Sequence, residues 1–281
     1  IAVLIGILLP AMGAARNTAR GTLCLSNLRQ LGIGWSMYAD DQKDTMLPLR
    51  PPDLGGGTAN AANHYEVGNG LKYRPRWIAT MGLYVGLTPF GEPSTADVRQ
   101  DYLGKVYSCP TVPSWTDESN HAYGYNYQFL GNSRRTAGRF HNYPLKRSTI
   151  QSFDRTLLGA DSMGTAAGVA PLARLPYEAR GSSLAGLGNH AYTIDPPRLG
   201  ATSDRGTGAS SSPRAAVDPR HQNRGNTVYL DGHGALLSLE ALGYRFDENG
   251  AVSERGSAGD PASNALFSGD GTDRLPPDRP L

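Results

Sequence analysis

The chain has 281 residues, of which 39% are hydrophobic, and glycine and proline together make up close to a fifth of it. That share is well above the usual one of roughly an eighth and predicts long ordered loops around a modest sheet. Basic and acidic residues number 27 and 25, for a net charge of +2. This balance gives no electrostatic reason to expect binding to nucleic acid or to an anionic membrane surface.

The N-terminal stretch is apolar, and its first charge is Arg16. A run of about 15 uncharged residues is too short for a membrane span, which needs roughly 20. We expect it to be the latter part of a longer apolar helix that buries itself in lipid or against other copies of the chain. Gly6 and Pro10 mark where this helix could kink or melt, because proline removes a donor and clashes with the preceding turn. The side chains expected to pack in the assembled core are Ile1, Val3, Leu4, Ile5, Ile7, Leu8 and Leu9.

The same helix changes character after Pro10. An apolar stripe with steps of four, three, four and three residues indicates one helical face. The pattern predicts a single helix from Ile1 to about Ala39, with residues 1–22 protruding and residues 23–281 forming a head that includes the helix from 23 to 40. A cleaved signal peptide and an ordinary core helix are weaker interpretations, because the helix continues into the body. The stripe comprises Cys24, Leu28, Leu31, Trp35 and Tyr38.

Short elements follow. The segment RWIATMGLYVG predicts a helix over 76–86, with Trp77, Met81 and Tyr84 on one face. Three segments rich in aromatic and β-branched residues predict strands. These are KVYSCP, YGYNYQFLG and RTLLGADS.

The strongest hairpin signal is NTVYLDGHGALLSL, in which Asp231-Gly232 and Gly234 tolerate the positive φ angles of a tight turn. The stretch 196–219 predicts a long surface loop. The tail from Asn249 onward predicts irregular packing or fraying. The fold class expected is α+β, a long N-terminal helix packed on a small antiparallel sheet with long irregular loops.

Motifs for nucleotide binding, zinc peptidase and serine hydrolase chemistry are absent from the sequence, which favours a non-enzyme. A mixed nitrogen and oxygen metal site is a weak alternative, built from Asp161, His221, Asp231 and His233. The simpler interpretation has His221 bonding a loop backbone and Asp231 accepting amide protons in its own turn. A calcium site from Asp161, Asp270 and Asp273 has no EF-hand loop to support it. We therefore expect no cofactor.

The two cysteines, Cys24 and Cys109, form no CxxC motif, which argues against a zinc site built from paired thiolates. They are either two separate buried thiols or one disulfide. Cys24 lies on the helix face that should meet the body, and Cys109 ends a strand candidate in that body. We favour the disulfide, which would stabilise the fold by roughly 2–4 kcal/mol.

The opening sequence IAVLIGILLPAMGAARNTARGTLCLSNLRQLGIGWSMYADD resembles the N-terminal helix of type IV pilin-like proteins and type II secretion pseudopilins. The similarity is greatest to the group from planctomycetes and related bacteria. There an apolar segment ending in Leu-Pro-Ala leads to an Arg-rich stretch and a Cys-x-x-Asn-Leu-(Arg/Lys)-Gln motif. The matching residues here are Cys24, Asn27, Leu28, Arg29 and Gln30.

Downstream segments extend the resemblance to about residue 240. YSCPTVP, YGYNYQFLG and TLLGADS are similar to family segments, and nine residues separate His221 from Asp231-Gly232, the His-x9-Asp-Gly signature of this group. Family members begin with a Phe-Thr-Leu-Ile-Glu-Leu-type segment, about a dozen residues that precede Ile1 in the family. The family's early glutamate therefore has no counterpart in this sequence.

The resemblance implies a structural subunit of an extracellular type IV pilus-like filament. The precursor would sit in the inner membrane, be cleaved by prepilin peptidase, and be assembled by dedicated machinery into a bundle of N-terminal helices. A pseudopilin of a type II secretion system is the runner-up. A membrane-anchored surface binding module and a metal-dependent enzyme are the other classes considered. The binding module would use exposed aromatic side chains, but we favour a place for these residues in the core of the head. They are Trp77, Tyr84, Trp115, Tyr123 and Tyr125.

Overall fold

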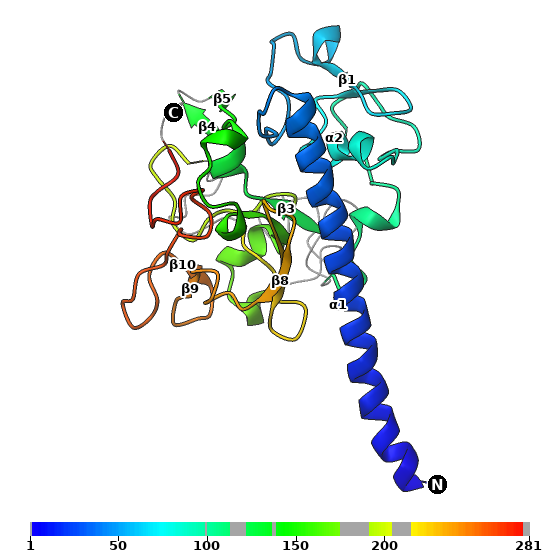
Figure 1. Cartoon of the computed structure of the whole chain (residues 1–281), viewed down its shortest axis with the longest axis vertical. Coiled ribbons are helices and arrows are strands. Elements are labelled where there is room, and N and C mark those ends of the chain that lie inside the picture. The colour runs from blue at the N-terminus through cyan, green and yellow to red at the C-terminus, as the bar shows by residue number, and fades with distance from the viewer. Residues whose placement is uncertain are drawn as a thin grey trace.

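A long helix and a loop-rich head make up the molecule (Figure 1). The computed structural model describes residues 2–98, 100–112, 122–136, 139–174, 191–203 and 215–277. Helix α1 runs over Ala2–Asp41 and projects well beyond the head at its N-terminal end. The expected α+β class, with a long helix on a small antiparallel sheet, is confirmed.

Helix α1 buries its predicted apolar stripe in the head. Cys24, Leu28, Leu31 and Trp35 are at most 1% exposed, and Tyr38 is half-buried. The spacing of three and four residues places these side chains on one face, so the helix can pack along the sheet while its other face stays in water. The second half of the helix is therefore part of the core.

The central sheet has four antiparallel strands in the order β3-β6-β7-β8. The strands are β3 (Tyr123–Tyr125), β6 (Leu157–Asp161), β7 (Gly225–Tyr229) and β8 (Gly234–Leu237). The predicted hairpin is confirmed as β7-β8, and Gly232 takes the left-handed φ of 87° that its turn requires. The strand expected in RTLLGADS is confirmed as β6.

Two of the strand predictions are corrected by the structure. KVYSCP forms a 3₁₀ turn at Lys105–Tyr107 because Tyr107 is buried beside α1 and no neighbouring strand pairs with this segment in the described residues. YGYNYQFLG is a strand only as far as Tyr125 and then forms a π-helical turn over Tyr127–Gly131. The buried Asn126 amide ends the strand by donating to the carbonyls of Leu157 and Phe267 at 2.9 and 3.0 Å.

Smaller elements complete the head. The predicted second helix is confirmed as α2 (Trp77–Tyr84). Three two-stranded sheets surround the central one. They are β1 (His64–Glu66) with β2 (Leu71–Tyr73), β4 (Ser133–Thr136) with β5 (Arg139–Asn142), and β9 (Arg245–Phe246) with β10 (Val252–Ser253).

The central sheet separates two hydrophobic clusters. Leu158 of β6 and Val228 of β7 belong to the cluster that contains the buried stripe of α1. Leu157 and Tyr229, their neighbours in sequence, belong to the other cluster. This division follows from the alternation of side chains along a strand. The C-terminal tail covers the second cluster with the buried Phe267, so the described part of the tail beyond β10 packs as irregular structure.

Candidate assembly surface and helix–head junction

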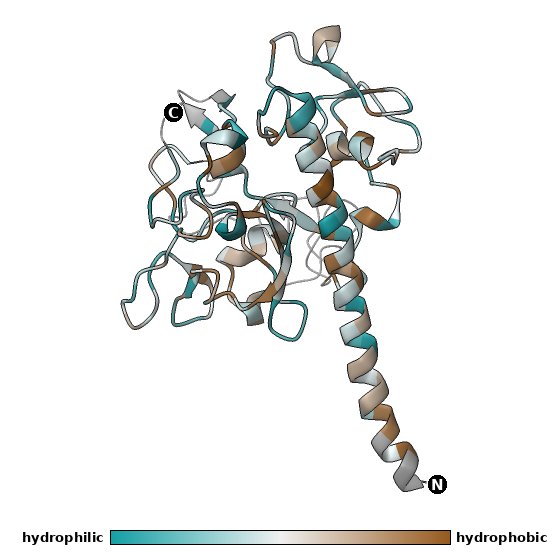
Figure 2. Ribbon diagram, viewed as in Figure 1, coloured by the Kyte–Doolittle hydropathy of each residue, from teal (hydrophilic) through white to brown (hydrophobic). Residues whose placement is uncertain are grey.

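The first half of α1 is rich in hydrophobic residues (Figure 2). Ile5, Leu8, Leu9 and Met12 are between 50% and 64% exposed. No charged residue occurs before Arg16. Among the other predicted core residues, Ile1 and the side chains of Val3, Leu4 and Ile7 lie outside the described part of the structure. We call the exposed stretch from Ile5 to Met12 the apolar arm.

The apolar arm runs without a break through the two positions expected to weaken it. Pro10 lies inside the continuous helix, and Gly6 has no atom within 4 Å of where a Cβ would stand. Melting at Gly6 and Pro10 during assembly stays a prediction. In the described residues, no helix has the length and hydropathy needed to cross a membrane.

The junction between arm and head begins at Gly21, where α1 first becomes partly covered. The Asn226 side chain of β7 donates to the Gly21 carbonyl at 3.1 Å. Six residues later, the buried Asn27 amide donates to the carbonyls of Lys105 and Ser108 at 2.9 and 3.2 Å. These bonds fix the helix lengthwise, which apolar packing alone does less specifically because it is non-directional.

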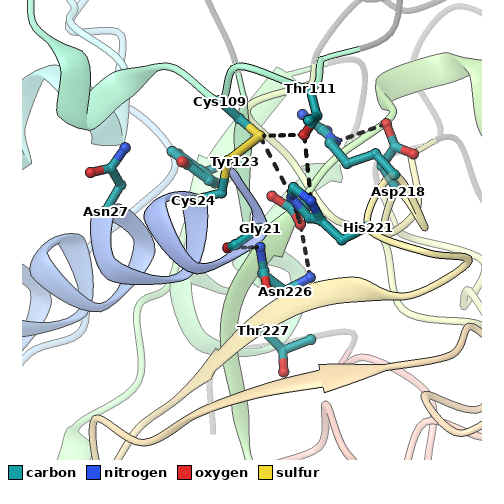
Figure 3. Close-up of polar contacts among 12 residues, drawn as sticks. Gly21, Cys24, Asn27, Cys109, Thr111, Tyr123, Asp218, His221, Asn226 and Thr227 are labelled. Carbon is teal, nitrogen blue, oxygen red and sulfur yellow. Dashed lines mark hydrogen bonds and ion pairs between the residues drawn. A yellow bond between two sulfur atoms is a disulfide. The ribbon is translucent and has the colours of Figure 1, made fainter. Parts of the chain in front are cut away.

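The predicted disulfide between Cys24 and Cys109 is confirmed, with the two Cα atoms 5.4 Å apart. Cys24 is the first fully buried residue of α1. The bridge therefore joins helix and head at the point where the helix enters the head (Figure 3).

His221 closes the junction from the opposite side (Figure 3). Its Nε2 lies 3.6 Å from Cys109 Sγ and 3.3 Å from Asp161 Oδ2, and its Nδ1 lies 3.5 Å from Thr111 Oγ1. A Cβ placed on Gly21 would stand 3.3 Å from His221 Nδ1. The glycine lets the imidazole reach the helix surface, so the helix, the loop after Cys109 and the central sheet meet at one ring.

Asp161 anchors that imidazole to the sheet. It is fully buried at the end of β6, and its Oδ2 accepts the Asn226 backbone N–H at 2.8 Å. Burial raises the pKa of Asp161 to about 7 and lowers the pKa of His221 to about 4, because removal from water disfavours both charged forms. The nearby Arg220 pairs with Asp218 at 3.1 Å, and its positive charge also lowers the pKa of His221. A pair in which both side chains are neutral fits this environment.

The His-x9-Asp-Gly spacing has a structural explanation. His221 precedes β7 and contacts the disulfide, whereas Asp231 and Gly232 follow β7 and form the turn into β8. Asp231 accepts the His233 backbone N–H at 3.0 Å, as expected for a carboxylate in its own turn. Nine residues are what one strand and its flanking turns require to join these two positions.

The four weak metal-ligand candidates form two separate pairs. Asp161 contacts His221 in the junction, while Asp231 contacts His233 Nδ1 at 2.6 Å on the exposed hairpin. The simpler expectation for His221 is also corrected, since its ring contacts Asp161 and Thr111 and only its backbone bonds the loop at Arg224.

The calcium candidates are likewise apart. Asp270 pairs with Arg274 at 3.0 Å and Asp273 with Arg198 at 2.8 Å, while Asp161 is in the junction. In the described part of the chain, Cys24, Cys109 and His221 are the group with metal-ligand spacing, and its two sulfurs are bonded to each other.

The aromatic residues considered for surface binding are mostly core. Trp77, Tyr123 and Tyr125 have no exposed area, and Trp77 stacks on Trp35 with ring centroids 4.5 Å apart. Tyr84 is half-buried and donates to Asp41 at 2.8 Å. Trp115 lies outside the described residues. The favoured interpretation of these aromatic residues as head core is therefore confirmed for Trp77, Tyr123 and Tyr125, and these three are not available to bind a ligand at the surface.

The sequence reasoning missed two features. The first is the convergence of Asp161 and His221 on the disulfide, for which the nearness of both residues to strand ends was the available signal. The second is a basic cavity around β2, for which the alternating cations of LKYRPRW were the signal.

Comparison with family models, curated proteins and solved structures found no match to this chain.

Proposed function

We propose that this chain is a structural, non-catalytic subunit of an extracellular type IV pilus-like filament. The observation that carries the proposal is the apolar arm, a helical segment with large exposed apolar side chains and no covering partner in the described part of the chain. The disulfide, which suits an oxidising compartment outside the cytoplasm, supports the localisation. The motif resemblance of the N-terminal helix adds independent support.

Assembly follows from burial of the apolar arm against the arms of other copies. Each large apolar side chain that leaves water stabilises the assembled state by about 1.5–3 kcal/mol before the entropy of association is subtracted. The arm of one copy and the receiving surface of the next are different faces, so the contacts need not close. Heterologous contacts of this kind generate an open helix. Before assembly, the inner membrane would solvate the arm.

The junction supplies the rigidity that such a subunit needs. A filament under tension loads each helix against its own head, and the bond most resistant to that load is the covalent Cys24–Cys109 bridge. The Asn27 and Asn226 hydrogen bonds lie on either side of this bridge. The head therefore stays fixed to its helix while the arms form the core.

The proposal is tested by imaging material sheared from cells that express the chain. We expect long fibres by negative-stain microscopy, with this chain as the major component by mass spectrometry. Leu8→Asp should abolish the fibres, because a carboxylate would be placed in a dry helical bundle. Short structures that stay with the cell envelope would instead indicate the pseudopilin alternative.

The matched control is Leu172→Asp. Leu172 is fully exposed on the head, so the same substitution there should leave fibres and folding unchanged. Circular dichroism of both variants checks that the head is folded. Normal fibres from the Leu8→Asp strain would contradict the proposed role of the apolar arm.

A further inference from the structure

A cavity of about 140 Å³ lies in the head beside β2, apart from the junction. It is much larger than the roughly 10–15 Å³ that one water requires. The neighbouring β1 lies at the end of the molecule opposite the N-terminus of α1 (Figure 1). Four cationic side chains line the cavity against one carboxylate, Asp97. The cations are Arg50, Lys72, Arg74 and Arg76.

Arg50 lines the cavity and carries an unpaired donor. Its Nε is buried and has no hydrogen-bond partner, and its Nη2 makes only a long 3.4 Å bond to the Arg74 carbonyl. Burial, together with the positive charges of Arg74 and Arg76, lowers the pKa of Arg50. A buried guanidinium donor without an acceptor is uncommon in native proteins and calls for an explanation.

Lys72 makes no ion pair with a described residue either, although the charge of Asp97 acts on it from beyond ion-pair distance. Lys72 is buried, with 7% of its surface exposed. Its Nζ donates to the neutral Val98 carbonyl at 3.1 Å. Within the described residues, no carboxylate lies within ion-pair distance of Lys72 or Arg50. Burying such cations without a partner is costly, so an anion that entered the cavity would relieve the cost.

The other two cations are held in place by contacts outside the cavity. Arg74 pairs with Asp53 at 3.3 Å and donates to the Pro51 carbonyl, and Arg76 stacks on Tyr192 with the guanidinium carbon 4.0 Å from the ring centre. The backbone of Arg74 has φ of 35°, a conformation that residues other than glycine seldom adopt. Strain of this kind concentrates at ligand sites.

We propose that this cavity binds a dianionic tetrahedral oxyanion, either as free phosphate or sulfate or as a phosphate monoester on a saccharide. The excess of cations favours a dianion over a carboxylate, and the planar guanidinium fork of Arg50 matches two oxygens of a tetrahedral anion. Tyr73, Tyr102 and Phe90 also line the cavity, and Lys72 Nζ lies 5.7 Å from the centre of the Phe90 ring. The site is independent of filament assembly and would give the filament a ligand.

The test is calorimetric titration of the full 281-residue chain in detergent at low ionic strength. The probes are inorganic phosphate, inorganic sulfate and glucose 6-phosphate. We expect saturable one-to-one binding of at least one probe and at least tenfold weaker binding in Arg50→Gln. Tighter binding of glucose 6-phosphate than of either ion would identify a saccharide phosphate ester as the source, and equal binding would identify the free ion.

Two further variants keep the test decisive. Arg155→Gln removes an exposed cation that does not line the cavity and should bind as the unchanged chain does. Lys72→Gln should also weaken binding, and it replaces Arg50→Gln if circular dichroism shows the latter to be unfolded. The proposal is overturned by the absence of binding of all three probes at millimolar concentration, or by an equal loss of binding in Arg155→Gln.

Discussion

The two halves of α1 are one continuous helix in two environments. Leu8 and Leu9 in the first half are more than half exposed, whereas Leu28 and Leu31 in the second half are fully buried. The same residue type thus serves two purposes, and only its surroundings distinguish them. A segment can therefore form a helix without being buried by its own head. An apolar helix that extends past its own core leaves apolar surface that another molecule can cover.

The two halves also differ in what holds them in helical form. The second half is fixed by the disulfide, by the Asn27 amide and by the stacking of Trp35 on Trp77. In the described residues, the apolar arm is held only by the hydrogen bonds of its own helix backbone, and an isolated helix of such length is marginal in water. We therefore expect the apolar arm to fray in the isolated chain and to become firm only when another apolar surface covers it.

The largest effect expected on the buried half is that of Trp35→Ala. Trp35 is 1% exposed and contacts both Trp77 and Tyr125, so its loss should lower the free energy of unfolding by about 3–5 kcal/mol. Met37, two residues along, is 46% exposed, and Met37→Ala should change it by less than about 0.5 kcal/mol. Urea unfolding followed by circular dichroism measures both, and equal effects would erase the distinction between the two helix faces.

Removing the disulfide tests the boundary between the halves. The double variant Cys24→Ser and Cys109→Ser opens a loop with a sequence separation of 85 residues and should lower the free energy of unfolding by about 2–4 kcal/mol. The comparison is a non-reducing urea titration of the variant and of the unchanged chain. A variant as stable as the unchanged chain would show that the bridge is not what secures the helix to its head.

The smallest effect concerns Asp161 and His221. The raised pKa of Asp161, about 7 from burial, gives stability that is present below about pH 4 and is lost as the pH rises toward 7. The lowered pKa of His221, about 4 from burial, gives stability that is present above about pH 6.5 and is lost as the pH falls toward 4. Between these limits the two contributions offset each other.

Single substitutions should unmask each contribution. Relative to the unchanged chain, His221→Gln should lose stability as the pH rises from 4.5 to 6.5, by at most about 1.4 kcal/mol per pH unit. Asp161→Asn should show the opposite slope. The measurement is a series of urea titrations across this range. If the free energy of unfolding changed with pH in the same direction in both variants, the opposite pKa shifts of Asp161 and His221 would be contradicted.

The sequence predicted correctly the elements that depend on neighbouring residues alone. The stripe from Cys24 to Trp35 and the Asp231-Gly232 turn depend on spacing and on backbone freedom, and both are confirmed. The prediction of a strand around Tyr107 was wrong. The segment forms a 3₁₀ turn because packing beside α1 outweighs its β propensity. Contacts with residues far away in the sequence cannot be predicted from a segment of six residues.

The junction shows the same limit. A disulfide between Cys24 and Cys109 could be favoured from the helix face on which Cys24 lies, and it is confirmed. The position of His221 against the disulfide could not be predicted, because it depends on the register in which β7 pairs with β6. The contact between Asp161 and His221 follows from this strand register, and no sequence motif indicates it.

Hydrogen–deuterium exchange of the two helix halves tests the central claim most directly. Peptides from residues 5–20 and 24–41 are compared in dispersed and in assembled protein. We expect residues 5–20 to exchange fast when dispersed and to become strongly protected on assembly, while residues 24–41 are protected in both states. Unchanged exchange of residues 5–20 on assembly would contradict the account, because the apolar arm would then not be the surface that joins the copies.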